Sequence, residues 1–378
     1  MSIIEPFNLD NNVIPFDEID PYNPQNTLCG FVNRRQGNLY GSLFITHVNN
    51  ISCKQTIFCT PKMHYPFSKE DKWSFPEADT IIFYPKEDGT NIYSYTYIDT
   101  NNITYLTYKT RLRPFLGTSK YGNFKALWDE MLEKYPDIKK LCHTKRFGFS
   151  FELFGKRNKI LMEYDVPLDT VLLFARQQKN GLIVSPHTME PTLKKYNVPY
   201  LKTLAILNVI NKEIYLDHQQ TLENALDVDE ENKILRGKEG TIMYFIKNDN
   251  VSQIKCKSKT ILKYHWGGDA INYMSILTTV INAFENFDSP TIDDVNQLLA
   301  EEFDEGKITK SLTRTQKILD RVTFDRKYQN KLSIDYNEQC FNINKDKATC
   351  MRWFAEHYPK AQAKRIYTLL KQYVDEHE

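Results

Sequence analysis

The sequence predicts an α+β protein, with antiparallel sheets and helices up to about residue 268 and an all-helical domain from 269 to 378. Before residue 268, short runs of β-branched and aromatic residues alternate with turn residues, which is the pattern of strands and hairpins. After it, apolar residues recur at the spacing of helices. A chain of 378 residues is long enough for two such domains. The pair Gly267 and Gly268 is the predicted hinge.

Strands are expected in six places, because β-branched and aromatic residues dominate there and turn residues bound them. They cover 27–60, 80–84, 91–98 with 103–108, 147–153, 159–164, and 240–246 with 251–258. A helix is predicted over 123–141, with a break at Pro136, since a proline ring cannot continue a helix. The C-terminal helices begin near Ile271, and Pro290 precedes an acidic first turn, as at a helix start.

Composition indicates a soluble globular protein. Apolar residues make up 41% and charged residues 26%, and the net charge of +1 excludes a polycation but allows a local basic groove. Neither a signal peptide nor an apolar run of ~18 residues is evident, so we expect a cytoplasmic protein with no membrane partner. The seven cysteines and eight histidines are scattered, which predicts neither a disulfide framework nor a zinc site.

The segment most suggestive of chemistry follows the apolar strand 80–84, where the chain reads Lys86, Glu87, Asp88 and Gly89. A lysine at the end of a buried strand, followed by an acid and a turn-forming glycine, suits a positioned amine nucleophile. An ordinary surface turn would have the same composition. The decision therefore depends on residues elsewhere in the chain.

Two glutamates could act with this lysine. Strand alternation puts Glu152 among small side chains, on the face opposite a row of phenylalanines, as a metal-binding or ligand-binding carboxylate would be; a solvated glutamate is the alternative. Glu239 opens the hairpin at 240–246, where Gly240 permits close backbone approach. Neither residue is decisive by itself.

Two lysines on the returning strand of the same hairpin point the same way. Lys255 and Lys257 are two residues apart, so they share one face of the strand. Like charges side by side repel unless an anion lies between them, and a polyphosphate would supply that anion. An exposed edge strand would tolerate the pair too.

Cations and aromatic residues are interleaved over 101–125, where the sequence has no acid. They are Lys109, Arg111, Arg113, Lys120, Lys125, Tyr105, Tyr108, Phe115, Tyr121 and Phe124. This is the composition of a groove for single-stranded nucleic acid; a basic sheet edge with its aromatics in the core is equally compatible. Lys109 and Arg111 are expected to share a strand face and to reach toward Lys86. No Gly-rich phosphate loop is present.

Four segments in order resemble the motifs of the covalent nucleotidyltransferases, a superfamily unrelated to ATP-grasp enzymes. They are 86–89, 151–155, 239–242 and 255–257, similar to motifs I, III, IV and V. The chain most resembles ATP-dependent RNA ligases of the RNA ligase 1 group of T-even phages, in which a helical domain follows motif V. Asn158, Lys159, Ile160 and Tyr164 also look like that group. Tyr40 and Gly41 depart from it, because the group has Arg-Gly there, and so does the segment 61–67.

The resemblance implies ATP and Mg²⁺ (or Mn²⁺) as cofactors and an RNA ligase reaction through a lysyl-AMP and an adenylylated RNA 5′ end. It implies Lys86 as nucleophile, with Asp88, Lys255 and Lys257 as further catalytic residues. Glu152, Glu239 and Asp88 would hold the metal, and Phe174 would stack on the purine unless it is a core residue. Nucleotide contacts are expected from Lys86, Glu87, Gly89, Lys109, Arg111, Glu152, Phe174, Glu239, Lys255 and Lys257. Neighbouring cations would lower the pKa of Lys86 from its usual ~10.4.

Single-stranded or nicked structured RNA, such as tRNA, is the expected partner of a monomeric repair enzyme. A DNA ligase or capping guanylyltransferase shares the motif order but normally has an OB-fold after motif V, whereas helical periodicity follows here. A non-catalytic RNA-binding protein is the other alternative. Cations of the helical domain could contact RNA or could lie on solvated helix faces; they are Lys310, Arg314, Lys317, Arg321, Arg326, Lys327, Lys364 and Arg365.

Overall fold

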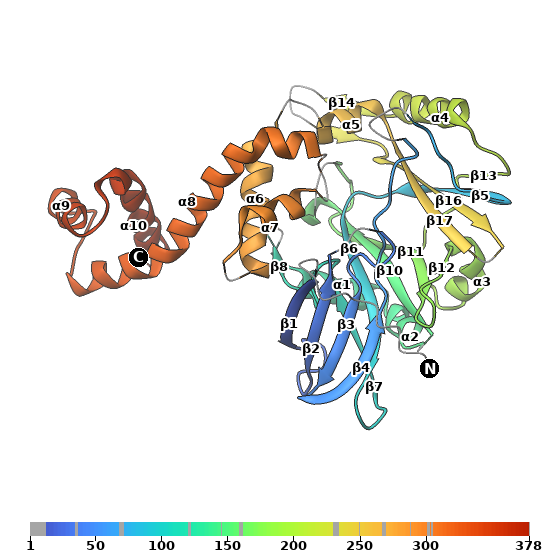
Figure 1. The fold of residues 1–378 in the computed structure, drawn as a ribbon, viewed down its shortest axis with the longest axis horizontal. Helices are drawn as coiled ribbons and strands as arrows, with labels where there is room; N and C mark the ends of the chain where they lie inside the picture. Colours follow the sequence, from blue (N-terminus) through green and yellow to red (C-terminus); the bar gives the residue numbers. More distant parts are fainter. Residues whose placement is uncertain are drawn as a thin grey trace. The chain divides into compact units, whose positions relative to one another are not determined.

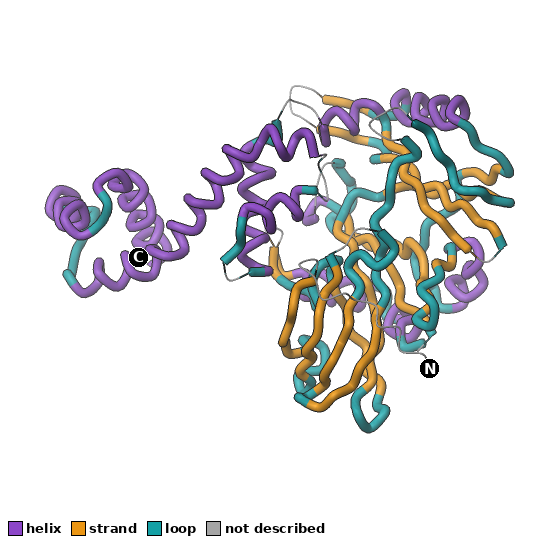
Figure 2. Tube along the Cα trace, viewed as in Figure 1, coloured by secondary structure: helices purple, strands orange, loops and turns teal. Residues whose placement is uncertain are grey.

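The computed structural model confirms the α+β class, with antiparallel sheets and a helical C-terminal region (Figures 1 and 2). It describes residues 13–34, 37–67, 72–119, 122–144, 146–158, 162–229, 234–248, 250–266, 270–287, 289–300, 303 and 305–377. The chain divides into two compact units, Met1–Tyr264 and His265–Glu378. Gly267 and Gly268, the predicted hinge, lie outside the described residues.

Three antiparallel sheets form the first unit. One has the order β1 (Val13–Ile19), β2 (Thr27–Asn33), β3 (Leu43–Val48), β4 (Ile51–Ile57). The second has the order β12 (Ile183–Val184), β11 (Asp169–Gln177), β10 (Phe147–Phe154), β6 (Thr90–Ile98), β7 (Thr104–Lys109). The third has the order β13 (Ala205–Leu207), β5 (Thr80–Lys86), β16 (Gly240–Lys247), β17 (Asn250–Lys257). Two short ribbons pair β8 (Thr118–Ser119) with β9 (Gly122–Asn123) and β14 (Asp227–Asp229) with β15 (Ile234–Arg236).

Helices pack on the outer faces of the second and third sheets. The helices of this unit are α1 (Phe124–Lys134), α2 (Asp137–Cys142), α3 (Pro186–Lys195), α4 (Lys212–Asn224) and α5 (Lys259–Trp266), with the 3₁₀ turn η1 (Lys156–Asn158). Trp128 of α1 and Leu193 of α3 share one buried cluster with Phe149 and Phe151 of β10. Tyr215 of α4 packs in another with strands β5, β16 and β17. The second and third sheets are therefore each covered by helices on one face, and their other faces pack against each other.

A third cluster joins the two inner faces and fixes the direction of the key side chains. Ile82 and Tyr84 of β5 and Ile242 of β16 meet Phe174 of β11 there, whereas Ile81 and its neighbours face α4. Because side chains alternate along a strand, Lys86 has the parity of Ile82 and Tyr84. The strand pattern therefore directs Lys86 toward the second sheet.

Most predicted elements are confirmed, with exceptions in two places. The helix expected over 123–141 exists as α1 and α2, and the break falls at Pro136 as predicted. The strand expected over 159–164 is wrong for its described part, in which Met162 makes only an isolated bridge with Leu235; Lys159 and Ile160 lie outside the described residues. β1 was not predicted, although alternating burial of its residues fits a surface strand.

The second unit consists of helices throughout its described residues. They are α6 (Tyr273–Asn286), α7 (Ile292–Leu299), α8 (Glu305–Glu338), α9 (Lys347–His357), the 3₁₀ turn η2 (Lys360–Gln362) and α10 (Ala363–His377). Helix α7 begins at the predicted place, with Thr291 and Asp294 forming a capping box. One apolar cluster joins α6 and α7 to the first half of α8, and another joins its second half to α9 and α10. No helix in the described chain is long and apolar enough to cross a membrane.

Four of the predicted RNA-contacting cations in this unit have partners within it. Arg314 donates to the carbonyl of Ile271 at 3.0 Å, Arg321 to the hydroxyl of Tyr273 at 2.7 Å, and Arg326 to the carbonyl of Phe284 at 3.5 Å. Arg365 forms a forked ion pair with Asp325. Three of these contacts connect two helices, and that of Arg314 joins α8 to the segment before α6, so they give the arginines a structural role that the sequence does not reveal.

Candidate active site

Strand β16 lies between β5 and β17, and each of these two neighbouring strands ends in a lysine. Lys86, the last residue of β5, lies opposite Gly240 of β16, and Gly240 lies opposite Lys257, the last residue of β17. Lys255 lies opposite Ile242, which belongs to the cluster between the two sheets, so both β17 lysines share the inner face with Lys86. The predicted same-face placement of Lys255 and Lys257 is confirmed.

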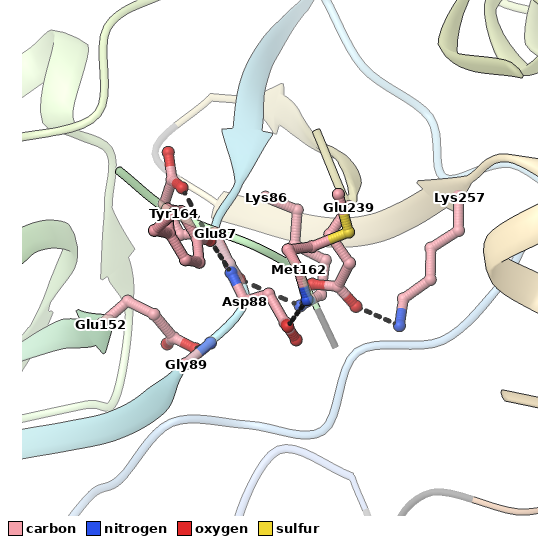
Figure 3. Close-up of polar contacts among 9 residues, drawn as sticks. All are labelled: Lys86, Glu87, Asp88, Gly89, Glu152, Met162, Tyr164, Glu239 and Lys257. Carbon is pink, nitrogen blue, oxygen red and sulfur yellow. Dashed lines mark hydrogen bonds and ion pairs between the residues drawn. The ribbon is translucent and has the colours of Figure 1, made fainter. Parts of the chain in front are cut away.

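Glu239 bridges two of these lysines. One of its carboxylate oxygens pairs with the Lys86 ammonium and the other with the Lys257 ammonium (Figure 3). The side chain of Glu239 is 2% exposed, that of Lys257 8% and that of Lys86 19%. Lys86 is therefore the member of this triad that solvent, or a substrate, can reach.

The loop after Lys86 is held by hydrogen bonds from a second segment (Figure 3). The backbone N–H of Asp88 donates to the Tyr164 hydroxyl at 2.7 Å, and that hydroxyl donates to the Glu87 carboxylate at 3.1 Å. The backbone N–H of Met162 donates to the Asp88 carboxylate at 2.7 Å. Asp88 and Glu87 are thus occupied in ordering the loop. The sequence offered only resemblance as a signal for Tyr164, and none for Met162.

Glu152 reaches the same loop from β10. Its Oε1 accepts from the backbone N–H of Gly89 at 3.1 Å, and the residue is 9% exposed. Burial raises the pKa of this carboxyl to about 7, although Lys86 and Arg111 act in the opposite direction. The alternative of a solvated glutamate is excluded by this burial.

The electrostatics of the lysines differ from the expectation. Burial lowers the pKa of Lys86, but the carboxylates of Glu239, Glu152 and Asp88 outweigh burial, so the net shift is upward. The predicted lowering is therefore wrong for the site without ligands. Lys255 goes the other way: burial and the charges of Lys257 and Lys86 lower its pKa to about 7. Its ammonium lies 4.5 Å from the ring centre of Tyr65, a contact that the sequence did not predict.

Gly89 has no room for a side chain. A Cβ on this residue would lie 2.0 Å from the backbone oxygen of Leu153 and 2.8 Å from its carbonyl carbon. We expect Gly89→Ala to push the loop away from β10, to break the contact with Glu152 and to reduce nucleotide binding at least tenfold, as measured by calorimetric titration with ATP. Unchanged ATP affinity in Gly89→Ala would contradict the close packing of this loop.

The predicted nucleotide contact of Lys109 conflicts with its position. The side chain is 0% exposed, and its ammonium donates to the carbonyls of Gly41, Thr110 and Arg111 at 2.8 to 2.9 Å and to Cys59 Sγ at 3.3 Å. An ammonium so enclosed has no hydrogen left for a phosphate. The expected shared strand face with Arg111 is also wrong, because β7 ends at Lys109.

The basic and aromatic segment 101–125 belongs largely to the core. Tyr108 and Phe124 are members of the cluster under α1, and Phe115 is 3% exposed. Lys125 forms an ion pair with Asp129, one helical turn away. Lys120 and Tyr121 lie outside the described residues. The alternative of a basic sheet edge with its aromatics in the core therefore fits better than a groove for single strands.

Phe174 is a core residue and not a stacking platform. It is 1% exposed and packs between the two sheets against Ile82, Tyr84 and Tyr244. A ring already covered in this way has no free face for a purine. The predicted stacking role conflicts with this packing, and the core alternative is the one observed.

The three predicted metal ligands fit a metal unequally. The described chain contains no group of three or more His, Cys, Asp or Glu side chains arranged to hold an ion. Glu239 is already paired with two ammonium groups. Burial raises the pKa of the Glu152 carboxyl, which means that its charged form is unfavourable there, and an added cation would stabilise that charged form. Magnesium needs only one or two carboxylates and keeps its waters, so Glu152 suits such an ion.

The chain is similar in fold to solved ligases. A scan against protein-family models finds no match, and no curated protein matches the sequence. An archaeal ATP-dependent RNA ligase is 13% identical, with 84% of this chain and 76% of that chain covered at a TM-score of 0.46. A proposed ATP-dependent DNA ligase from Aquifex aeolicus is 14% identical, with 85% and 77% covered at 0.44. An RNA ligase from Naegleria gruberi is 16% identical, with 50% and 52% covered at 0.36. No function of this chain follows from identities this low.

Proposed function

We propose that this protein is an ATP-dependent RNA ligase that works through a covalent lysyl-AMP. The observation that carries the proposal is the lysine at the end of β5, the most exposed member of a buried triad with Glu239 and Lys257. A structural ion pair has no need of a third charged group, or of a loop held by three further residues. A nucleophilic amine that must meet one phosphorus atom needs both.

The chemistry assigns each charge a task. The Lys86 amine attacks the α-phosphorus of ATP, a phosphoramidate N–P bond forms, and the bond to pyrophosphate breaks. The ammonium must first release a proton to solvent, which reaches Lys86, and the nearby carboxylates, which raise the pKa of Lys86, oppose that loss. Lys255 and Lys257 neutralise the phosphates as charge shifts to the leaving pyrophosphate. In two further steps, an RNA 5′-phosphate oxygen takes the AMP from Lys86, and a 3′-hydroxyl then displaces AMP to join the ends.

A divalent ion, Mg²⁺ or Mn²⁺, is part of the proposal. Glu152 would hold it, with Asp88 at its water shell, and when bound it supplies positive charge to the triphosphate. Glu239 could bind the ion only if one of its ion pairs with Lys86 and Lys257 broke. We therefore assign Glu239 to positioning these two lysines. This replaces the simpler expectation of three equivalent carboxylate ligands.

RNA is favoured over the alternatives by two features. The described part of residues 265–378 is helical and lacks strands, whereas DNA ligases and capping enzymes are expected to have an OB-fold there. A purely RNA-binding protein would gain nothing from a buried cluster of Lys86, Glu239 and Glu152. The proposal also includes what the sequence resemblance implies. The enzyme would belong to the RNA ligase 1 group, act as a monomer with an adenylyltransferase domain at 1–268, and repair RNA such as nicked tRNA.

A covalent adduct tests the proposal directly. Incubation with α-labelled ATP and Mg²⁺ is expected to label the protein in an acid-labile bond, and Lys86→Ala should abolish labelling because no other amine occupies that position. Lys247→Ala is the control, since this lysine also ends a strand and pairs with a glutamate, Glu77, but at the surface. Absence of labelling in the wild type under varied metal and pH would refute the ligase proposal. Labelling by GTP in place of ATP would assign the protein to the capping enzymes.

A further inference from the structure

Helix α4 contacts the outer edge of the strand that carries Lys255 and Lys257. Strand β17 is the last strand of the third sheet, so every second backbone N–H and C=O along it points away from the sheet. The backbone N–H of Lys255 points to that edge, where it donates to the carbonyl of His64 at 3.1 Å. The carbonyls of Lys255 and Lys257 point the same way, because the direction of the polar groups repeats every second residue.

Two side chains of α4 supply hydrogen-bond donors to these carbonyls. The Tyr215 hydroxyl donates to the Lys255 carbonyl at 3.1 Å, and the Gln219 amide donates to the Lys257 carbonyl at 2.8 Å. Tyr215 and Gln219 are one helical turn apart and therefore lie on the same face of the helix. Both residues are buried, with 0% and 5% of their surface exposed. The main chain of each lysine is thus fixed to α4.

The next turn of α4 holds the chain shortly after Lys257. Glu223 accepts from the backbone N–H of Thr260 at 2.9 Å and also from the Thr260 hydroxyl, in the first turn of α5. Glu223 follows Gln219 by four residues, so it continues the same face of α4. One row of side chains on α4 therefore follows the chain from the two lysines into α5.

A series of contacts connects this row to the reactive lysine. Gln219 holds the main chain of Lys257, whose ammonium pairs with Glu239, and Glu239 pairs in turn with Lys86. Helix α4 lies on the outer face of the sheet, where Tyr215 packs in the cluster with β5, β16 and β17. The lysine side chains point to the inner face, so the row on α4 can act on a substrate only through them.

We propose that Tyr215 and Gln219 are positioning residues for the reaction with ATP, because they set where the ammonium groups of Lys255 and Lys257 lie against the phosphates. Pyrophosphate is the ligand most affected, since the two lysines are assigned to its charge as it leaves. This inference rests on the proposed function for the reaction, whereas pyrophosphate binding can be measured without it. A displacement of about 1 Å can cost about 100-fold in rate.

The experiment compares two variants that each lose one donor. Tyr215→Phe removes the hydroxyl, and Gln219→Met replaces the amide by an apolar group of similar length. Single-turnover labelling with α-labelled ATP gives a rate constant and an amplitude, and calorimetric titration gives the affinity for inorganic pyrophosphate. We expect each variant to lose about tenfold in the rate constant and about fivefold in pyrophosphate affinity. A merely structural role would lower the amplitude and the thermal unfolding midpoint and would leave the rate constant and the affinity unchanged.

Matched controls remove the same groups from carbonyls elsewhere in the first unit. Tyr95→Phe deletes a hydroxyl that donates to the Pro114 carbonyl at 2.9 Å. Gln55→Met deletes an amide that donates to the Ile98 carbonyl at 2.8 Å. Neither control should change the rate constant or the pyrophosphate affinity.

The possible results separate the positioning role from the ligase function. Wild-type rate constants and pyrophosphate affinities in Tyr215→Phe and Gln219→Met would overturn the inference, as would losses confined to the amplitude and the unfolding midpoint. Weakened pyrophosphate binding by both variants of a protein that never forms the adduct would keep the positioning role and reject the ligase function. A wild type that neither forms the adduct nor binds pyrophosphate would reject both.

Discussion

Replacing Glu239 with glutamine is expected to reduce adenylylation by about 100-fold or more, the loss typical of misplaced reacting groups. The glutamate gives one oxygen to Lys86 and the other to Lys257. A glutamine has a single acceptor oxygen, and its amide N–H groups would face the second ammonium. One lysine therefore loses its partner inside a buried site, where an unpaired charge costs about 3–5 kcal/mol of stability. Single-turnover labelling with α-labelled ATP, together with thermal unfolding, measures both effects.

The pH dependence separates electrostatics from positioning. The pKa of Lys86 is raised, so in the wild type the reactive amine fraction, and with it the labelling rate, should rise about tenfold per pH unit between pH 7 and 10. Loss of the Glu239 charge removes the largest upward influence on that pKa. The rate of Glu239→Gln should therefore level off at a lower pH than that of the wild type. Identical profiles for the two proteins would mean that Glu239 does not act on Lys86.

Strand β17 shows which features of the site can be predicted from the sequence. Two lysines spaced by one residue on a strand must share a face, whatever the surrounding fold, and Lys255 and Lys257 do. The same rule gave the direction of Glu152 from its strand. The grouping of Glu239 with both Lys86 and Lys257 was not predictable in this way, because it depends on which strand ends meet across 153 residues of chain.

The predictions fail for side chains whose surroundings are set by other segments of the chain. Lys109 has the composition of a phosphate contact, yet three carbonyls from two segments enclose it. Phe174 lies on the strand beside β10, but both of its faces are covered in the layer between the sheets. Tyr164 holds the loop of Lys86 from another segment of the chain. In each case at least one decisive contact comes from a distant segment of the chain, and the periodicity of the sequence does not show such contacts.

The enclosure of Lys109 leads to a large expected effect on stability. The residue is 0% exposed, and burial lowers the pKa of its ammonium while its hydrogen bonds hold it in place. Replacement by methionine preserves most of the volume but removes every donor. The carbonyls of Gly41, Thr110 and Arg111 would each lose the donor that the ammonium supplies. Each unsatisfied buried group costs about 1–3 kcal/mol.

Lys109→Met is therefore expected to lower the free energy of unfolding by about 3–5 kcal/mol, less than the full sum because water re-solvates part of the loop. Urea denaturation measures the change. The matched control is Lys125→Met, which removes a partly exposed ion pair with Asp129 and should cost roughly 0.5 kcal/mol. A Lys109→Met protein with the free energy of unfolding of the wild type would show that this lysine does not support the fold.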